Sequence, residues 1–227
     1  MTLEFIVATC WQPSWHECVV SWLTPGTTSC NITLLPMRDI VDAYQEGYER
    51  STADILAHIH DDLKILEPDW DKRVMKEFEN PEVALVGFAG APQHGVDGMY
   101  DRPFDIGTMI RLGFTSNLVN AEQHGARYAG EMNATILDGL AFFVRRSFLD
   151  EIGGWPTSTV ISYFMYMEWL CCMVRRQKKR IRMVGVRCDH LGGRSTGRNP
   201  NLRIDFEGEH RFIYEAFRDV MPGMVEP

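Results

Sequence analysis

The chain has 227 residues, of which 45% are hydrophobic and 24% charged, and its formal net charge is -8. This length can bury the core of one large domain or of two small ones. No apolar run approaches the roughly 18 residues of a membrane span, so the composition excludes an integral membrane protein and most classes of disordered protein.

The first ten residues carry no Lys or Arg ahead of their apolar stretch, and Glu4 lies inside it. A secretory signal has the opposite charge pattern, so we expect a cytoplasmic protein. The six cysteines include no Cys-x-x-Cys pair. This spacing argues against a zinc ribbon and requires no disulfide.

Charge is distributed unevenly along the chain. The segment from Arg175 to Arg203 holds ten Lys or Arg and one acid, Asp189, which gives +9 and leaves -17 for the remainder. A basic segment in an acidic chain indicates either an anionic ligand or a solvated helix face.

The first part of the chain alternates apolar, β-branched segments with amphipathic ones, which is the order of an α/β protein. A continuously hydrophobic strand such as 83–88 is typical of a sheet covered on both faces. Strands are predicted at 5–10, 31–35, 54–59 and 83–88, and helices at 14–23, 39–50 (N-cap Asp39) and 68–78.

Residues 90–130 are rich in glycine and polar side chains, and we expect a long functional loop there. The elements expected after it are a strand at 137–144, helices at 146–152 and 163–178, and a strand at 181–186. Because no repeat or linker interrupts the chain, we predict one domain over residues 1–227.

The adjacent carboxylates Asp61 and Asp62 directly follow the predicted strand 54–59, together with His60. The carboxyl end of a strand is where an open α/β sheet places its ligands. Two neighbouring carboxylates repel each other unless they are exposed or a cation neutralises them. The pair therefore indicates either a divalent metal site or a turn or helix cap.

His190 follows the predicted strand 181–186 and precedes a loop with glycines, hydroxyls and basic side chains. A neutral imidazole could be a second ligand to the same ion, or a surface residue. In this loop Arg194, Ser195 and Arg198 could hold a diphosphate through charge and hydrogen bonds.

Asp138 interrupts the apolar segment 137–144. A carboxylate in such a place either faces a polar cleft or forms a turn at the start of the strand. The sequence leaves both interpretations open.

The blocks AHIHDDLKILEPDW, PEVALVGFAG, LDGLAFFVRRSFLDEIGGW and DHLGG occur in that order over roughly residues 3–196. Together they resemble the GT-A nucleotide-sugar glycosyltransferases, and in particular the family-2-like subgroup with His-Asp-Asp in place of Asp-x-Asp. The resemblance implies a GT-A, Rossmann-like fold with a mixed, mostly parallel sheet flanked by helices. Residues 1–90 would form the nucleotide-binding half, and residues 91–227 the acceptor-binding half with the metal and diphosphate loop.

The resemblance also implies roles for individual residues. Asp62 and His190 match the metal ligands, with Asp61 near the metal or the ribose, and the cofactor is Mn²⁺ or Mg²⁺. His60 replaces the first Asp of the motif, which leaves open whether it contacts the nucleotide or orients Asp62. The further positions that match the nucleotide site are Thr9, Cys10, Trp11, Pro36, Arg38, Asp39 and Gln45.

On the acceptor side, Asp138 matches the family's Asp-Gly block. Related enzymes carry a catalytic carboxylate at the start of the helix after the Gly-Gly-aromatic turn, where this chain offers Glu168. Glu168 is therefore the expected base. The competing interpretation is an ordinary helix carboxylate paired with Arg175 or Arg176.

The expected reaction is an inverting transfer of a sugar from a nucleoside diphosphate, such as UDP, to an acceptor hydroxyl. The acceptor is either a glycan or, given the basic segment and the aromatics near residue 166, a hydroxymethylated base in DNA. Two alternatives remain: a non-catalytic module that binds nucleotide sugars, and a metal-dependent phosphohydrolase using His58, His60 and Asp61.

Overall fold

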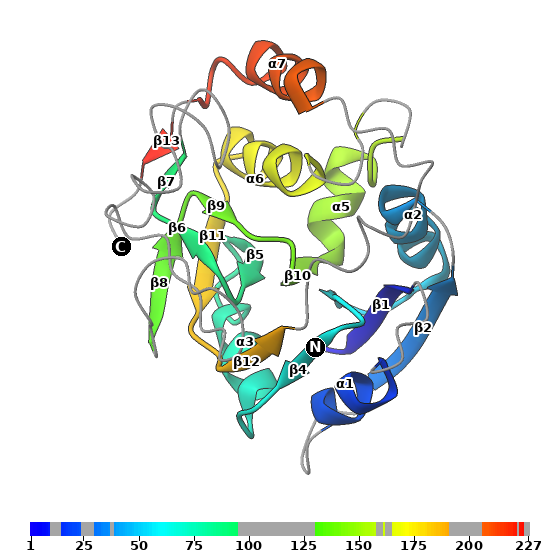
Figure 1. Cartoon of the computed structure of the whole chain (residues 1–227). Helices are drawn as coiled ribbons and strands as arrows, with labels where there is room; N and C mark the ends of the chain where they lie inside the picture. Colours follow the sequence, from blue (N-terminus) through cyan, green and yellow to red (C-terminus); the bar gives the residue numbers. More distant parts are fainter. Residues whose placement is uncertain are drawn as a thin grey trace.

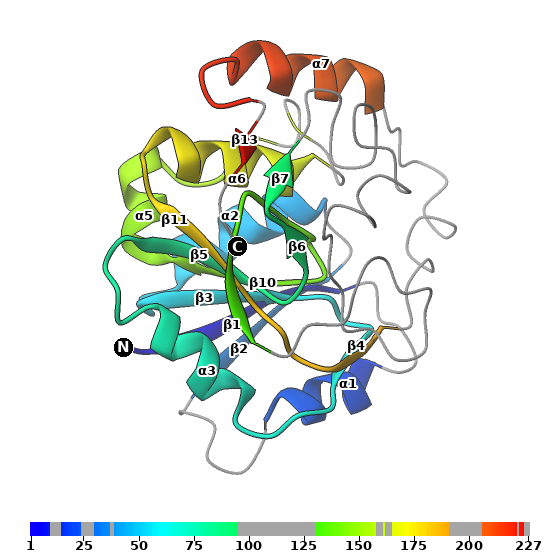
Figure 2. The same ribbon diagram turned by 90° about the vertical axis from the view of Figure 1, so that its left-hand side faces the viewer.

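The computed structural model describes residues 1–9, 15–23, 30–36, 39–94, 130–157, 161, 165–190, 206–221 and 223–224. In these residues a seven-stranded sheet lies between two layers of helices (Figures 1 and 2). The predicted α/β class is therefore confirmed. No helix in this part of the chain has the length and apolar character needed to cross a bilayer.

The sheet is mixed and mostly parallel. Its strand order is β2-β1-β3-β10-β5-β11-β8. β10 runs antiparallel to both of its neighbours, and β8 runs antiparallel to β11. The bounds of the strands are β1 Leu3–Thr9, β2 Cys30–Pro36, β3 Ile55–Ile59, β5 Val83–Gly87, β8 Glu131–Ala134, β10 Ala141–Arg145 and β11 Arg180–Val184.

Helices cover both faces of the sheet (Figure 2). On one side lie α1 (Trp15–Trp22) and α3 (Trp70–Glu77). On the other lie α2 (Ile40–Arg50), α5 (Arg146–Ile152) and α6 (Tyr166–Arg176), with α7 (Phe206–Ala216) beyond α6.

Two hydrophobic cores follow from this layering. Ile6 and Leu56 belong to the core under α2, α5 and α6, while Phe5 and Ile55 belong to the core with α1 and α3. Successive side chains of a strand point to opposite faces, so a strand buried on both sides supplies both cores. The continuous hydrophobicity of β1, β3 and β5 is thus explained by helices on each face.

Short antiparallel pairs connect distant segments. They are β4 (Leu63–Ile65) with β12 (Cys188–His190), β6 (Gly90–Ala91) with β9 (Ile136–Leu137), and β7 (Gln93–His94) with β13 (Gly223–Met224). None of these pairs was predicted, because a strand of two or three residues carries no periodicity that a sequence pattern could reveal.

One predicted strand is wrong. Residues 137–144 do not form a single strand but are divided into β9 and β10 by a turn at 138–140. In this turn the Asp138 carboxylate accepts a hydrogen bond from the backbone N–H of Leu140 at 2.9 Å. The expected loop at 90–130 begins with β6 and β7, and residues 95–129 lie outside the described part of the chain.

Candidate metal and nucleotide site

The candidate site begins where β1 and β3 end. These strands are parallel neighbours, and β2 lies on the other side of β1. The chain order therefore reverses at β1, and an open α/β sheet binds ligands outside the carboxyl ends of its strands at such a reversal. Thr9 is the last residue of β1, and His60 directly follows β3.

Asp61 is fixed at this edge by a hydrogen bond from β1. The Thr9 hydroxyl donates to Asp61 Oδ2 at 2.7 Å, and both side chains are buried. The structure therefore brings together two of the residues expected at the nucleotide site. One oxygen of Asp61 is occupied by the protein itself.

The pairing of β4 with β12 brings His190 to Asp62. Their register sets His190 opposite Leu63, the residue that follows Asp62. β4 is fixed in turn by Trp22, whose indole N–H donates to the Leu63 carbonyl at 2.8 Å. As a result His190 Nε2 lies 3.2 Å from Asp62 Oδ1, although 127 residues separate them in the chain.

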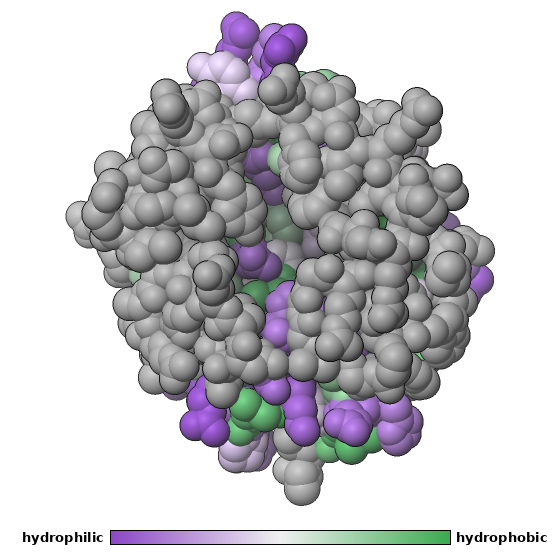
Figure 3. All heavy atoms as spheres, viewed as in Figure 1, coloured by the Kyte–Doolittle hydropathy of each residue, from purple (hydrophilic) through white to green (hydrophobic). Residues whose placement is uncertain are grey.

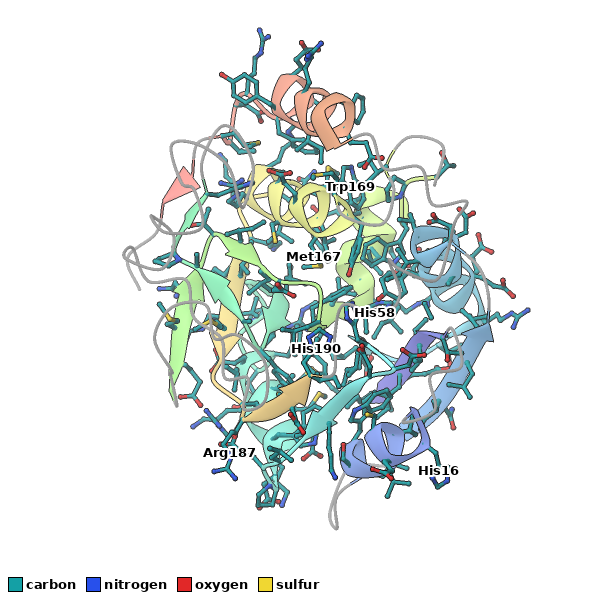
Figure 4. All side chains as sticks on the ribbon, in the orientation of Figure 1. His16, His58, Met167, Trp169, Arg187 and His190 are labelled. Atoms are coloured by element: carbon teal, nitrogen blue, oxygen red, sulfur yellow. The ribbon has the colours of Figure 1, made fainter. Side chains whose placement is uncertain are left out.

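The ligand atoms of His60, Asp62 and His190 converge. All three lie within 4.8 Å of one another, and His60 Nδ1 is 3.5 Å from His190 Nε2. Figure 4 places His190 near the middle of the molecule, with Met167 projecting from α6 toward the same region. Hydrophilic residues are visible at the centre of this face in Figure 3. Imidazole and carboxylate groups converging in this way are suited to a divalent cation.

The side chains of this group shift one another's pKa values. Burial is the largest single influence on Asp62 and opposes its ionised form, but the hydrogen bond from His190 and the charges of His190 and His60 together outweigh it, so the pKa of the Asp62 carboxyl lies below its usual value. Burial is likewise the largest single influence on His190 and opposes its charged form, but the hydrogen bond to Asp62 and the neighbouring carboxylate charges together raise the His190 pKa. Burial, followed by the charge of His190, lowers the pKa of His60.

The turn that contains Asp138 borders this group. The backbone N–H of His60 donates to the Leu140 carbonyl at 3.0 Å. The charge of Asp138 acts on both His60 and His190. Asp138 is therefore a half-buried turn residue that also lies near the metal-competent side chains, so the two interpretations of its sequence position are compatible.

Glu168 lies in the first turn of α6 and is 4% exposed. Its Oε1 is 2.7 Å from Nε2 of His94, a fully buried residue of β7. Arg175, two turns further along α6, places Nη2 2.8 Å from His94 Nδ1. Arg can only donate, so Nδ1 accepts and the ring proton is on Nε2, which donates to Glu168. Sequence reasoning missed His94, because no local pattern links it to a helix 74 residues away.

Asp39 and Gln45, which were also expected at the nucleotide site, form hydrogen bonds with residues outside the His60–Asp62–His190 group. The Asp39 carboxylate caps α2 by accepting from the Val41 N–H at 2.9 Å. Gln45 accepts from the backbone N–H of Trp155 and donates to Glu49, and it lines an open cavity of about 670 Å³. Pro36 ends β2, and its side chain is not described. The other residues expected at the nucleotide and diphosphate sites lie outside the described residues; they are Cys10, Trp11, Arg38, Arg194, Ser195 and Arg198.

Three of the solved structures with a similar fold are glycosyltransferases. GalNAc-T7 with UDP, GalNAc and Mn²⁺ matches with a TM-score of 0.67 and 10% identity, over 96% of this chain and 49% of that one. The mannosyltransferase PcManGT from Pyrobaculum calidifontis, with GDP-Man and Mn²⁺, matches with a TM-score of 0.59 and 14% identity, over 99% and 66%. This chain thus spans about half of the first protein and two thirds of the second.

A third match is a mutant Drosophila β-1,4-galactosyltransferase 7 with manganese, UDP-Gal and xylobiose. Its TM-score is 0.52 at 12% identity, over 93% of this chain and 80% of that one. Identities this low establish the fold alone, and the GT-A fold expected from the sequence is confirmed.

A comparison with curated protein sequences gives no significant match. A family model described as "Glycosyltransferase like family" matches residues 20–190, which include the His-Asp-Asp segment and His190. The match covers most of the chain and confirms the resemblance on which the site residues were assigned. The chain belongs to this glycosyltransferase-like family.

Proposed function

We propose that this protein transfers a sugar from a nucleoside diphosphate sugar to an acceptor hydroxyl with the help of Mn²⁺ or Mg²⁺. The observation that carries the proposal is the approach of His190 to Asp62 at the carboxyl ends of β1 and β3. The nucleotide sugars and Mn²⁺ bound to the structural neighbours support it. Two of these neighbours hold UDP or UDP-Gal, so UDP-sugars are the donors to test first.

Asp62 and His190 are the proposed metal ligands, and they fit a divalent cation because a buried carboxylate oxygen and a partly buried imidazole nitrogen lie only 3.2 Å apart. A bound cation supplies Lewis-acid stabilisation of the charge that develops on the departing diphosphate. Asp61, whose Oδ2 accepts the Thr9 hydroxyl and which is absent from the convergent group, is proposed to contact the ribose.

The acceptor hydroxyl loses a proton as it attacks the sugar, so a carboxylate is needed on the acceptor side. Asp138 and Glu168 are the two candidates. Asp138 is the one whose charge acts on His60 and His190, while Glu168 accepts a hydrogen bond from His94 in the protein interior. We therefore place the base first at Asp138, with Glu168 second, and propose a single inverting displacement.

Replacing Asp62 by Asn tests the metal assignment. The variant retains the size of the side chain but loses the negative charge, so transfer from a UDP-sugar in the presence of Mn²⁺ should fall by about 100-fold or more. The measurement is release of UDP with and without a panel of glycan acceptors and hydroxymethylated DNA. Asp69→Asn, which makes the same change at an exposed residue before α3, is the control and should retain activity.

Three results would contradict the proposal. Unchanged transfer in Asp62→Asn removes the metal assignment. Phosphate release from nucleotides without any acceptor favours the phosphohydrolase. Donor binding by calorimetry without turnover on any acceptor favours a non-catalytic binding module.

The base assignment is tested with Asp138→Asn and Glu168→Gln. A lost general base lowers turnover by about 100- to 10,000-fold and leaves donor affinity nearly unchanged. We expect this result for Asp138→Asn. Glu168→Gln should mainly lower the free energy of unfolding, because it disturbs a buried hydrogen-bond network. The same loss of turnover in a folded Glu168→Gln variant would assign the base to Glu168.

A further inference from the structure

His60 stands where the related motif carries a carboxylate, and its surroundings hold it rigidly. Its N–H is bonded to the Leu140 carbonyl at 3.0 Å, and its own carbonyl accepts from the Leu63 N–H at 3.1 Å. The backbone is therefore fixed on both sides of the ring. Two neighbouring segments, the turn before β10 and the start of β4, determine where the imidazole lies.

The imidazole ring of His60 contacts the ring of His190 and forms no hydrogen bond with the carboxylate of Asp62 among the described contacts. Its Nδ1 is 3.5 Å from His190 Nε2, the same atom that lies 3.2 Å from Asp62 Oδ1. The other ring nitrogen, Nε2, is buried and has no hydrogen-bond partner among the described residues. A residue that only orients Asp62 would be bonded to it. The observed convergence instead places three ligand atoms around one point.

Asp61 does not complete an oxygen-rich shell in this arrangement. Its Oδ2 accepts the Thr9 hydroxyl at 2.7 Å, and it is absent from the convergent group. Among the described residues, the convergent group therefore offers two imidazole nitrogens and one carboxylate oxygen. Mg²⁺ prefers oxygen ligands, whereas imidazole strengthens binding of first-row transition ions in the order Mn²⁺, Fe²⁺, Co²⁺.

We infer that His60 is itself a metal ligand, and that the His60–Asp62–His190 set makes this site selective for transition ions, with Co²⁺ bound more tightly than Mn²⁺ and Mn²⁺ more tightly than Mg²⁺. This inference rests on the proposed function for the location of the metal, and it deepens that function by naming the third ligand and the class of ion. At equal ion concentrations the site then binds a transition ion in preference to Mg²⁺.

Metal binding to the protein alone, without sugar transfer, provides the test. Chelator-treated protein is titrated with Mn²⁺ and followed by electron paramagnetic resonance, with Co²⁺ and a large excess of Mg²⁺ as competitors. His60→Asp restores an oxygen ligand at this position. We expect it to weaken Mn²⁺ binding relative to Mg²⁺ by about 10-fold or more, since even groups that only support a ligand contribute about 10- to 100-fold.

Pulsed electron paramagnetic resonance of the bound Mn²⁺ counts its nitrogen ligands directly. With ¹⁵N-histidine in the protein, we expect couplings from two imidazoles in the wild type and from one in His60→Asp. His16→Asp is the matched control, because it makes the same change at an exposed position of α1 and should alter neither the count nor the affinities. A circular-dichroism melt establishes that each variant is folded.

The outcomes separate this inference from the proposed function. One nitrogen coupling in the wild type, or equal ion preference in wild type and His60→Asp, overturns the role of His60 and leaves glycosyl transfer standing. Two couplings without transfer to any acceptor support the ligand set and contradict the function. If the wild type binds no Mn²⁺ even with UDP present, the metal site itself is wrong.

Discussion

His58 shows how strongly a single residue can depend on its surroundings. It lies in β3 and is completely buried, with its ring 4.1 Å from that of Tyr44, 4.7 Å from Phe142 and 5.4 Å from Trp155, measured between centroids. Burial removes the water that would stabilise a charged imidazole, and it lowers the pKa of His58 to about 3. The histidine is a neutral core residue and not a ligand, so His58 contributes nothing to the His-x-His-Asp pattern of a phosphohydrolase.

This low pKa predicts acid sensitivity. The ordinary pKa of 6.5 applies in the unfolded chain, so between pH 6.5 and pH 3 the unfolded state binds a proton that the folded state does not. Stability from this source is complete above pH 6.5 and falls by about 1.4 kcal/mol for each pH unit below it. His58→Phe should remove this slope in urea unfolding at pH 5, 6 and 7. His16→Gln, at an exposed position, should preserve it.

At the scale of elements, α2 packs on β1 through a glycine. A Cβ on Gly47 would overlap with Cγ2 of Ile6, which is fully buried in β1. The helix can therefore approach the strand this closely only without a side chain at position 47. The close packing holds α2 beside the strand end that carries Thr9.

Gly47→Ala should destabilise the protein by about 1–3 kcal/mol, the usual cost of overpacking a core. In an exposed helix, a Gly→Ala change would raise the free energy of unfolding by about 1 kcal/mol. A decrease instead would therefore indicate the overlap with Ile6. Denaturant unfolding measures it. In an Ile6→Ala background the cost should vanish, because the overlapping methyl is gone. An equal cost in both backgrounds would contradict the packing argument.

The longer elements could be predicted from the sequence, and the shortest could not. The helix at 146–152 was predicted with its observed bounds, and the Asp39 cap of α2 was predicted correctly. These signals are local in the sequence: regularly spaced apolar residues, a capping side chain, and a glycine at the helix end. That glycine, Gly153, adopts a φ of 84°. By contrast, β4 and β12 have three residues each, and their pairing depends on a contact across more than 120 residues.

On the scale of the whole molecule, the candidate site joins segments from both parts of the chain. Thr9 and Asp62 come from the first part, and Asp138 and His190 from the second. Strands of both parts belong to one sheet, in which β10 of the second part lies between β3 and β5 of the first. A donor bound there would contact all of these segments only in the folded state. Such binding is linked to global stability.

The melting temperature should therefore rise with a nucleotide sugar and Mn²⁺ together. At 100 times its dissociation constant, a ligand that binds only the folded state adds about 2.7 kcal/mol. Thermal melts with UDP-sugars and GDP-mannose, each with and without Mn²⁺, measure this and identify the preferred nucleotide. Asp62→Asn should lose the part of the shift that depends on Mn²⁺. A shift that is independent of Mn²⁺ in the wild type would contradict a shared site.

The sequence by itself determined the α/β class, the family and the segments that form the candidate site, because the spacing of hydrophobic residues and the His-Asp-Asp block are local properties of the chain. Only the tertiary structure decided which side chains meet: His60 and Asp62 with His190, Asp61 with Thr9, and Glu168 with His94. Those contacts depend on strand register and helix packing. Both result from burying distant apolar surfaces together, and no local pattern encodes that.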